Sequence, residues 1–128
     1  MSSAAHAYSR TARTGLSARQ LEASVLRQCT ADLLRAADAP DDQTGLLAAL
    51  DQNRRLWSLF SSAARAADND LPVALKASTL RIAGFVFKHT MDIVQAQANG
   101  EKTPLKTLLE PLIVLNRNLI TGLERSAG

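Results

Sequence analysis

The sequence predicts an all-α fold, a compact antiparallel bundle of about four helices, and three observations support this. Aromatic residues make up only 4% of the 128 residues, and Val and Ile are few, so a core of Leu and Ala favours packed helices over a sheet. Apolar residues recur at helical spacing in four stretches. Pro and Gly separate these stretches. The length suits one core, so we expect a single helical domain over 1–128, with 1–15 as a short N-terminal arm.

The first helix is expected to begin after Ser17, because Ser17 and Gln20 form a capping box just ahead of an apolar pattern. Apolar residues then recur every four positions, at Leu21, Val25, Cys29 and Leu33. The helix should end near 37, because Pro40 disfavours helical geometry in the residue before it.

The second helix is expected to start at Asp42 or Thr44 and to bury Leu46, Leu50, Trp57 and Phe60. Asn53 lies within the same stripe and should therefore face inward. Asp68-Asn69-Asp70 breaks this helix.

The third helix should start with Pro72 at its first position, where the missing N–H costs nothing. It should end at Asn99-Gly100, with Gly100 in a left-handed terminating conformation. Its apolar side is predicted to consist of Leu75, Ile82, Val86, His89 and Ile93, with Phe85 beside them.

The last helix should follow the Thr103-Pro104 cap and has the strongest periodicity, with leucines at alternating steps of three and four: Leu105, Leu108, Leu112, Leu115, Leu119 and Leu123. Such spacing gives a seam along a partner helix. Pro111 lies inside it and should either kink the helix or split it after Glu110.

The sequence offers no constellation of catalytic or metal-binding residues. We find no nucleophile with its base, no paired carboxylates in a predicted cleft and no phosphate-binding glycine loop, so we expect neither an enzyme nor a cofactor. His89 lies three residues before Asp92, which allows a coupled pair, although a hydrogen-bonded core histidine is the commoner arrangement. The single cysteine, Cys29, excludes an internal disulfide and is expected to be a small apolar core residue.

Seven residues are candidates for binding a partner, because they are polar or aromatic groups among the apolar seams: Tyr8, Asn53, Trp57, Phe60, Phe85, His89 and Asn116. One interpretation is that Trp57 and Phe60 fill the core while Asn53 and Asn116 satisfy helix ends or kinks, including a carbonyl freed by Pro111. The other is that some of them line a groove that receives a segment of another protein, with an aromatic anchor at its centre.

Several short motifs resemble the FlaF family of flagellar biosynthesis regulators. The blocks occur in the order of the family and span almost the whole chain: Ala7-Tyr8, Ser17-x-Arg19-Gln20-x-Glu22, Asn53-Arg54-x-Leu56-Trp57, Asn69-x-Leu71-Pro72, Phe85-Val86-x-x-His89-Thr90 and Leu112-Ile113-x-Leu115-Asn116-Arg117. The segment from Tyr8 to Leu34 is also similar to the start of the FliS flagellin export chaperones, which are small helical bundles.

The resemblance implies a flagellar regulator that promotes flagellin production and secretion and opposes the translational repressor FlbT. The likeness to FliS implies direct binding of unpolymerised flagellin as a chaperone. An alternative is a post-transcriptional regulator that acts through flagellin mRNA or by binding FlbT.

Charge and hydropathy narrow the range of partners. The net charge of +3 permits RNA contact but supplies no dense cationic stripe, so RNA is not expected as a direct ligand. No apolar run approaches the length that spans a bilayer, and the N-terminus lacks the apolar region of a secretory signal. We therefore expect a cytoplasmic protein without membrane contact, while the oligomeric state stays open.

Overall fold

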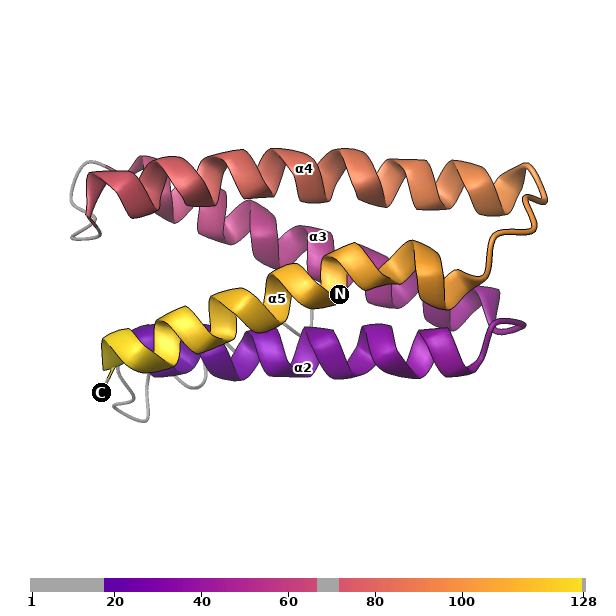
Figure 1. The fold of residues 1–128 in the computed structure, drawn as a ribbon, viewed down its shortest axis with the longest axis horizontal. Coiled ribbons are helices and arrows are strands. Elements are labelled where there is room, and N and C mark those ends of the chain that lie inside the picture. Colours follow the sequence, from indigo (N-terminus) through magenta and orange to yellow (C-terminus); the bar gives the residue numbers. More distant parts are fainter. Residues whose placement is uncertain (1–17, 67–71, 128) are drawn as a thin grey trace.

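The computed structural model describes residues 18–66 and 72–127, and these form four α-helices: α2 (Ala18–Asp38), α3 (Gln43–Arg65), α4 (Val73–Ala98) and α5 (Leu105–Ala127). Successive helices run in opposite directions, and the described residues contain no strand (Figure 1). The predicted all-α antiparallel bundle is therefore confirmed. The predicted arm over 1–15, Tyr8 and the Ser17 cap lie outside the described residues.

The four helices pack in a ring that is closed on three sides. α2 contacts α5 most extensively, and it also packs on α3, which in turn packs on α4. The fourth side, between α4 and α5, is joined at only a few residues. In Figure 1 these two helices diverge toward the N-terminal end of α4. The bundle therefore has one weakly packed interface.

The predicted joints are present at the ends of the helices. The Asp42 carboxylate accepts a hydrogen bond from the Gly45 backbone N–H at 2.9 Å, which makes Asp42 the N-cap of α3. Gly100 has φ of 67° and so takes the left-handed conformation expected after α4. Pro72 is the N-cap of α4 instead of its first helical residue, one position from the prediction. α5 continues through Pro111, so the helix is not split there.

The buried face of α5 differs from the predicted leucine seam. Leu109 and Ile113, outside the seam, are buried with Leu112, whereas Leu108 and Leu115 are only half-buried. The reason is that α5 packs mainly on α2, which rotates the centre of its buried face away from the seam. Of the seam residues, Leu115 lies at the weak interface with α4.

Candidate functional site

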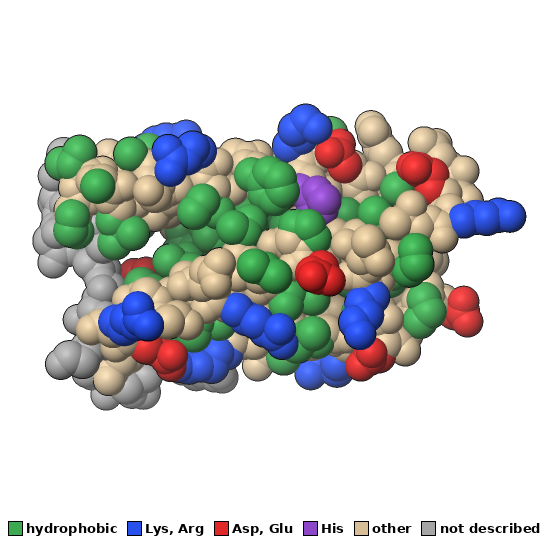
Figure 2. Space-filling view, in the orientation of Figure 1, with side chains coloured by type: hydrophobic (Ala, Val, Ile, Leu, Met, Phe, Trp, Pro, Cys, Tyr) green, Lys and Arg blue, Asp and Glu red, His purple; other side chains and the backbone are tan. Residues whose placement is uncertain are grey.

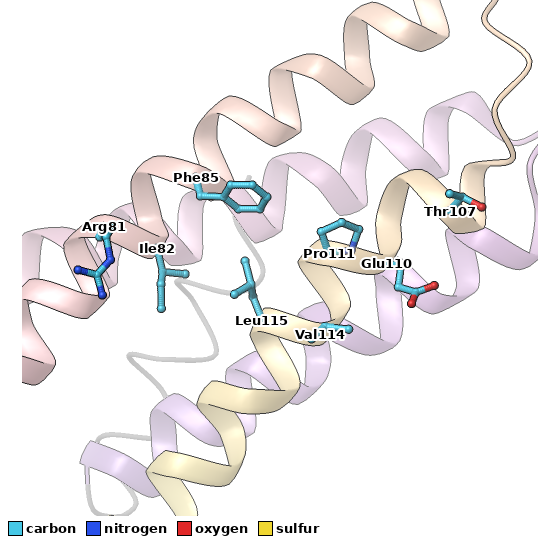
Figure 3. Close-up of a pocket in the computed structure, with 8 residues that line it drawn as sticks. All are labelled: Arg81, Ile82, Phe85, Thr107, Glu110, Pro111, Val114 and Leu115. Atoms are coloured by element: carbon cyan, nitrogen blue, oxygen red, sulfur yellow. The ribbon is translucent and has the colours of Figure 1, made fainter.

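A groove lies between α4 and α5, where the two helices separate. It has a volume of about 680 Å³ and appears as a hollow with hydrophobic side chains in the space-filling view (Figure 2). Four residues from α4 and α5 form its apolar lining near the centre: Ile82, Phe85, Pro111 and Leu115 (Figure 3). Arg81, Thr107, Glu110 and Val114 complete it.

Large apolar side chains remain accessible in this groove. Phe85 is 46% exposed and Val114 is 44% exposed. Burying either apolar side chain against another surface would be favourable. α4 also has Val73, Met91 and Val94 exposed, so apolar residues surround much of its circumference. A helix with apolar residues on several sides is normally covered by other elements. The groove therefore has the composition of a surface that binds another apolar surface.

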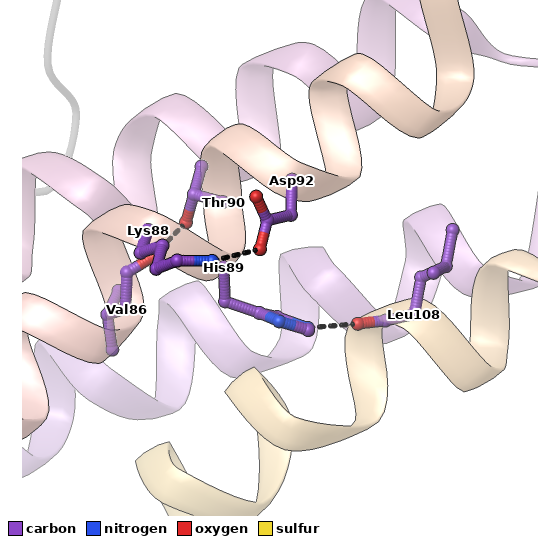
Figure 4. A network of polar contacts seen from close by, with 6 residues as sticks. All are labelled: Val86, Lys88, His89, Thr90, Asp92 and Leu108. Carbon is purple, nitrogen blue, oxygen red and sulfur yellow. Dashed lines mark hydrogen bonds and ion pairs between the residues drawn. The ribbon is translucent and has the colours of Figure 1, made fainter. Parts of the chain in front are cut away.

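His89 closes one end of the groove. Its Nε2 donates a hydrogen bond to the Leu108 carbonyl of α5 at 2.8 Å (Figure 4). Phe85 stacks on the His89 ring with centroids 5.3 Å apart and planes 12° apart. Asp92 pairs instead with Lys88, at 3.1 Å, so the arrangement is a hydrogen-bonded histidine and not a His–Asp pair. His89 thus fixes the position at which α4 and α5 begin to separate.

Pro111 leaves a backbone acceptor in the wall of the groove. An α-helical N–H bonds to the carbonyl four residues earlier, and proline has no N–H, so the Thr107 carbonyl lacks its usual donor. Thr107 and Glu110 both line the groove at its His89 end. This end therefore presents hydrogen-bond acceptors and a negative charge, whereas Arg81 lies on α4 toward the other end (Figure 3).

Three of the predicted site residues form a hydrogen-bonded chain in the core. Trp57 Nε1 donates to Asn116 Oδ1 at 2.9 Å, and Asn116 Nδ2 donates to Asn53 Oδ1 at 2.8 Å. All three side chains are at most 1% exposed. Phe60 packs edge-to-face on Trp57, with ring centroids 5.5 Å apart. The chain connects α3 with α5, which lie diagonally across the bundle.

The direction of this chain follows from the chemistry of tryptophan. An indole N–H only donates, so Asn116 must direct its oxygen at Trp57 and its amide nitrogen at Asn53. Asn53 must then accept through its oxygen, which leaves its own Nδ2 buried without a hydrogen-bond partner. Among residues 18–66 and 72–127, this amide nitrogen is a buried side-chain donor that the hydrogen-bonded chain does not satisfy.

Cys29 has the properties of an inert core residue. Burial, and to a lesser extent the nearby Asp32 carboxylate, raises the pKa of the Cys29 thiol to about 12 from 9.0. The thiol therefore stays protonated at neutral pH and is a poor nucleophile. No three His, Cys, Asp or Glu side chains among residues 18–66 and 72–127 are grouped as a metal site.

The predicted candidates divide into two groups. Asn53, Trp57, Phe60 and Asn116 lie in the core, whereas Phe85 and His89 lie at the groove, and Tyr8 lies outside the described residues. The α5 side of the groove was not among the site residues predicted from the sequence. The available signals were Pro111 inside a helix and Val114 outside the leucine seam.

The chain is similar to a known protein family. The model of the family described as flagellar protein FlaF matches residues 4–123. No curated protein and no solved structure matches the chain. No helix among the described residues is long and apolar enough to cross a membrane.

Proposed function

The chain belongs to the FlaF family of flagellar proteins, and on this premise we propose that it is a non-catalytic regulator that binds unpolymerised flagellin. It acts as a secretion chaperone and promotes the synthesis and export of flagellin. The observation that supports this proposal is the apolar groove between α4 and α5, with Phe85 and Val114 accessible in it.

The groove suits a helix of another protein. An amphipathic helix binds by placing its apolar face in a hydrophobic groove, with anchors spaced three and four residues apart. The terminal segments of flagellin are amphipathic and lack fixed structure before assembly, so they present apolar stripes that need cover. A helix between α4 and α5 would complete the weak side of the bundle.

Reversible binding is expected from the same physics. A client segment that becomes helical on binding loses conformational entropy, and this loss offsets part of the gain from burying apolar surface. The complex is then of moderate affinity, so it can release flagellin for export.

The direct test is a titration of the protein with monomeric flagellin, followed by anisotropy, at about 0.05 M and about 1 M salt. We expect saturable binding that changes little with salt, because apolar contacts are not screened by ions. Phe85→Ala should weaken binding about tenfold or more, as expected for an aromatic anchor. Its half-exposed position means that the melting temperature should change little.

Leu59→Ala provides a matched control, because Leu59 is 41% exposed on α3 and does not line the groove. This variant should bind flagellin normally. Absence of flagellin binding at micromolar concentration would contradict the proposal and favour FlbT as the direct partner. Binding to flagellin mRNA that disappears at high salt would instead favour the post-transcriptional alternative.

A further inference from the structure

The groove between α4 and α5 is polarised along its length. Glu110 lies at the end that His89 closes, together with the Thr107 carbonyl, which lacks the N–H donor that Pro111 cannot supply. Arg81 lies at the other end, on α4, with Phe85 and Pro111 between the two ends (Figure 3). The apolar centre therefore has hydrogen-bond acceptors on one side and a cation on the other.

The charges of Arg81 and Glu110 are not neutralised by ion pairs in the part of the chain that the structure describes. Within residues 18–66 and 72–127, neither Arg81 nor Glu110 has an ion-pair partner, and both are exposed. In contrast, Lys88 and Asp92, also near the closed end, neutralise one another at 3.1 Å. The free charges at the groove are thus available to a bound molecule.

A second cation, Arg117, lies on α5 just beyond the residues that line the groove. Arg117 follows Glu110 by seven residues on the same flank of α5 and has no ion-pair partner among the described residues. Seven residues are about two helical turns, or about 10 Å along the axis, toward the end where Arg81 lies. The distance between opposite charges along the groove is therefore about two turns of a helix.

We infer that the groove binds an amphipathic helix whose apolar stripe has a basic and an acidic side chain about two turns apart. The basic side chain lies over Glu110 and the Thr107 carbonyl, and the acidic side chain lies over Arg81 and Arg117. The two contacts fix the orientation of the helix on an apolar surface that would otherwise accept either direction. This inference rests on the proposed function, because it specifies the segment that a client presents.

The test uses three labelled synthetic peptides that share one apolar stripe and differ only at two positions seven residues apart. One peptide has Glu and Lys at these positions, one has Glu at both, and one has Lys at both. At low salt we expect the mixed peptide to bind about three- to tenfold more tightly than either of the others. The difference should disappear at about 1 M salt.

The net charge of the protein alone predicts a different order of affinities for the three peptides. The protein has a net charge of +3, so simple attraction would make the peptide with two Glu residues the tightest binder. That order, or equal affinity of all three peptides, would overturn the inference. A failure of all three to bind would overturn it too, because the groove would then accept no amphipathic helix.

Two substitutions locate the effect at the groove. Glu110→Gln should remove the advantage of the mixed peptide over the peptide with two Glu residues. Arg81→Gln should reduce the advantage of the mixed peptide over the peptide with two Lys residues, because Arg117 remains. Lys106→Gln, a change of an exposed residue on α5 outside the groove, should leave all three affinities unchanged. Changes of equal size in Lys106→Gln would overturn the assignment to this groove.

The proposed function fails separately from this inference. If flagellin binds and Phe85→Ala weakens it, but the peptides show no preference for opposite charges, the function stands and the charge pattern is wrong. If the mixed peptide is preferred but flagellin does not bind, the charge pattern stands and the client is another protein with such a helix.

Discussion

The buried chain Trp57–Asn116–Asn53 leads to a prediction in which two asparagines of equal burial respond differently to the same substitution. Both asparagine side chains have no exposed surface. Leucine copies the branched shape of asparagine without its polar atoms, so Asn116→Leu and Asn53→Leu both preserve packing. The two variants differ in the number of polar atoms that they leave without a partner.

The loss in free energy of unfolding depends on how many buried polar atoms each variant leaves without a hydrogen-bond partner. In the described part of the native core, one such side-chain atom is present, Asn53 Nδ2. Asn116→Leu adds two, Trp57 Nε1 and Asn53 Oδ1, and at about 1–3 kcal/mol for each the free energy of unfolding should fall by about 2–6 kcal/mol. Asn53→Leu removes the native unpartnered atom and creates one, Asn116 Nδ2, so its cost should stay within about 1 kcal/mol.

Urea unfolding followed by tryptophan fluorescence measures both values. Trp57 is the only tryptophan, so its emission reports on this part of the core. Equal slopes with urea would show that the variants expose similar surface on unfolding and that the free energies are comparable.

The double variant Asn53→Leu/Asn116→Leu provides an internal check. It leaves only Trp57 Nε1 without a partner, so it should recover much of the stability lost in Asn116→Leu alone. Equal costs for the two single variants, or a double variant less stable than Asn116→Leu, would refute the assigned direction of the hydrogen bonds.

Four further predictions concern two glycines, the N-cap of α3 and the cysteine. Gly84→Ala should raise the free energy of unfolding by about 0.5–1 kcal/mol, because Gly84 lies inside α4 and an added Cβ would meet no atom within 4 Å. Gly100→Ala should lower the free energy of unfolding by about 1 kcal/mol, because φ of Gly100 is 67° and a residue with a side chain is strained there. If the melting temperatures of the two glycine variants shifted in the same direction, this reasoning would be wrong. Asp42→Ala should lower stability by about 1 kcal/mol through loss of the α3 cap, measured by urea unfolding. Burial raises the pKa of the Cys29 thiol to about 12 in the folded protein, from an ordinary value of 9.0. The unfolded chain therefore loses this proton at a lower pH than the folded protein. The contribution of Cys29 to the free energy of unfolding should be complete below pH 9 and decline as the pH rises toward 12. The decline should be absent from Cys29→Ala, and a thiol reagent that modified the native protein rapidly at pH 7 would contradict the burial of Cys29.

The limits of the helices could be predicted from local chemistry. Asp42 caps α3, Gly100 ends α4 and Pro72 precedes α4 by the rules of single helix ends, which depend only on neighbouring residues. The inward position of Asn53 and Trp57 also follows from the helical period.

The contacts between helices could not be predicted in this way. Periodicity shows which residues share one face of a helix, but it does not show which helix that face contacts. Asn53 and Asn116 are 63 residues apart and meet only because α3 and α5 are diagonal neighbours in this bundle. The groove depends likewise on the weak contact of α4 with α5, which leaves Phe85 exposed although its sequence pattern allows burial.

The dominance of the contact between α2 and α5 has a consequence for how the protein is made. A ribosome releases the chain from its N-terminus, so α2 leaves first and its main packing partner leaves last. During that interval, α3 is the one helix of the described residues that packs directly on the apolar face of α2, which includes Leu26 and Leu33. The core is therefore completed after synthesis of the last helix, and a nascent chain that stalls before residue 105 would display the apolar face of α2 to the chaperones of the cell.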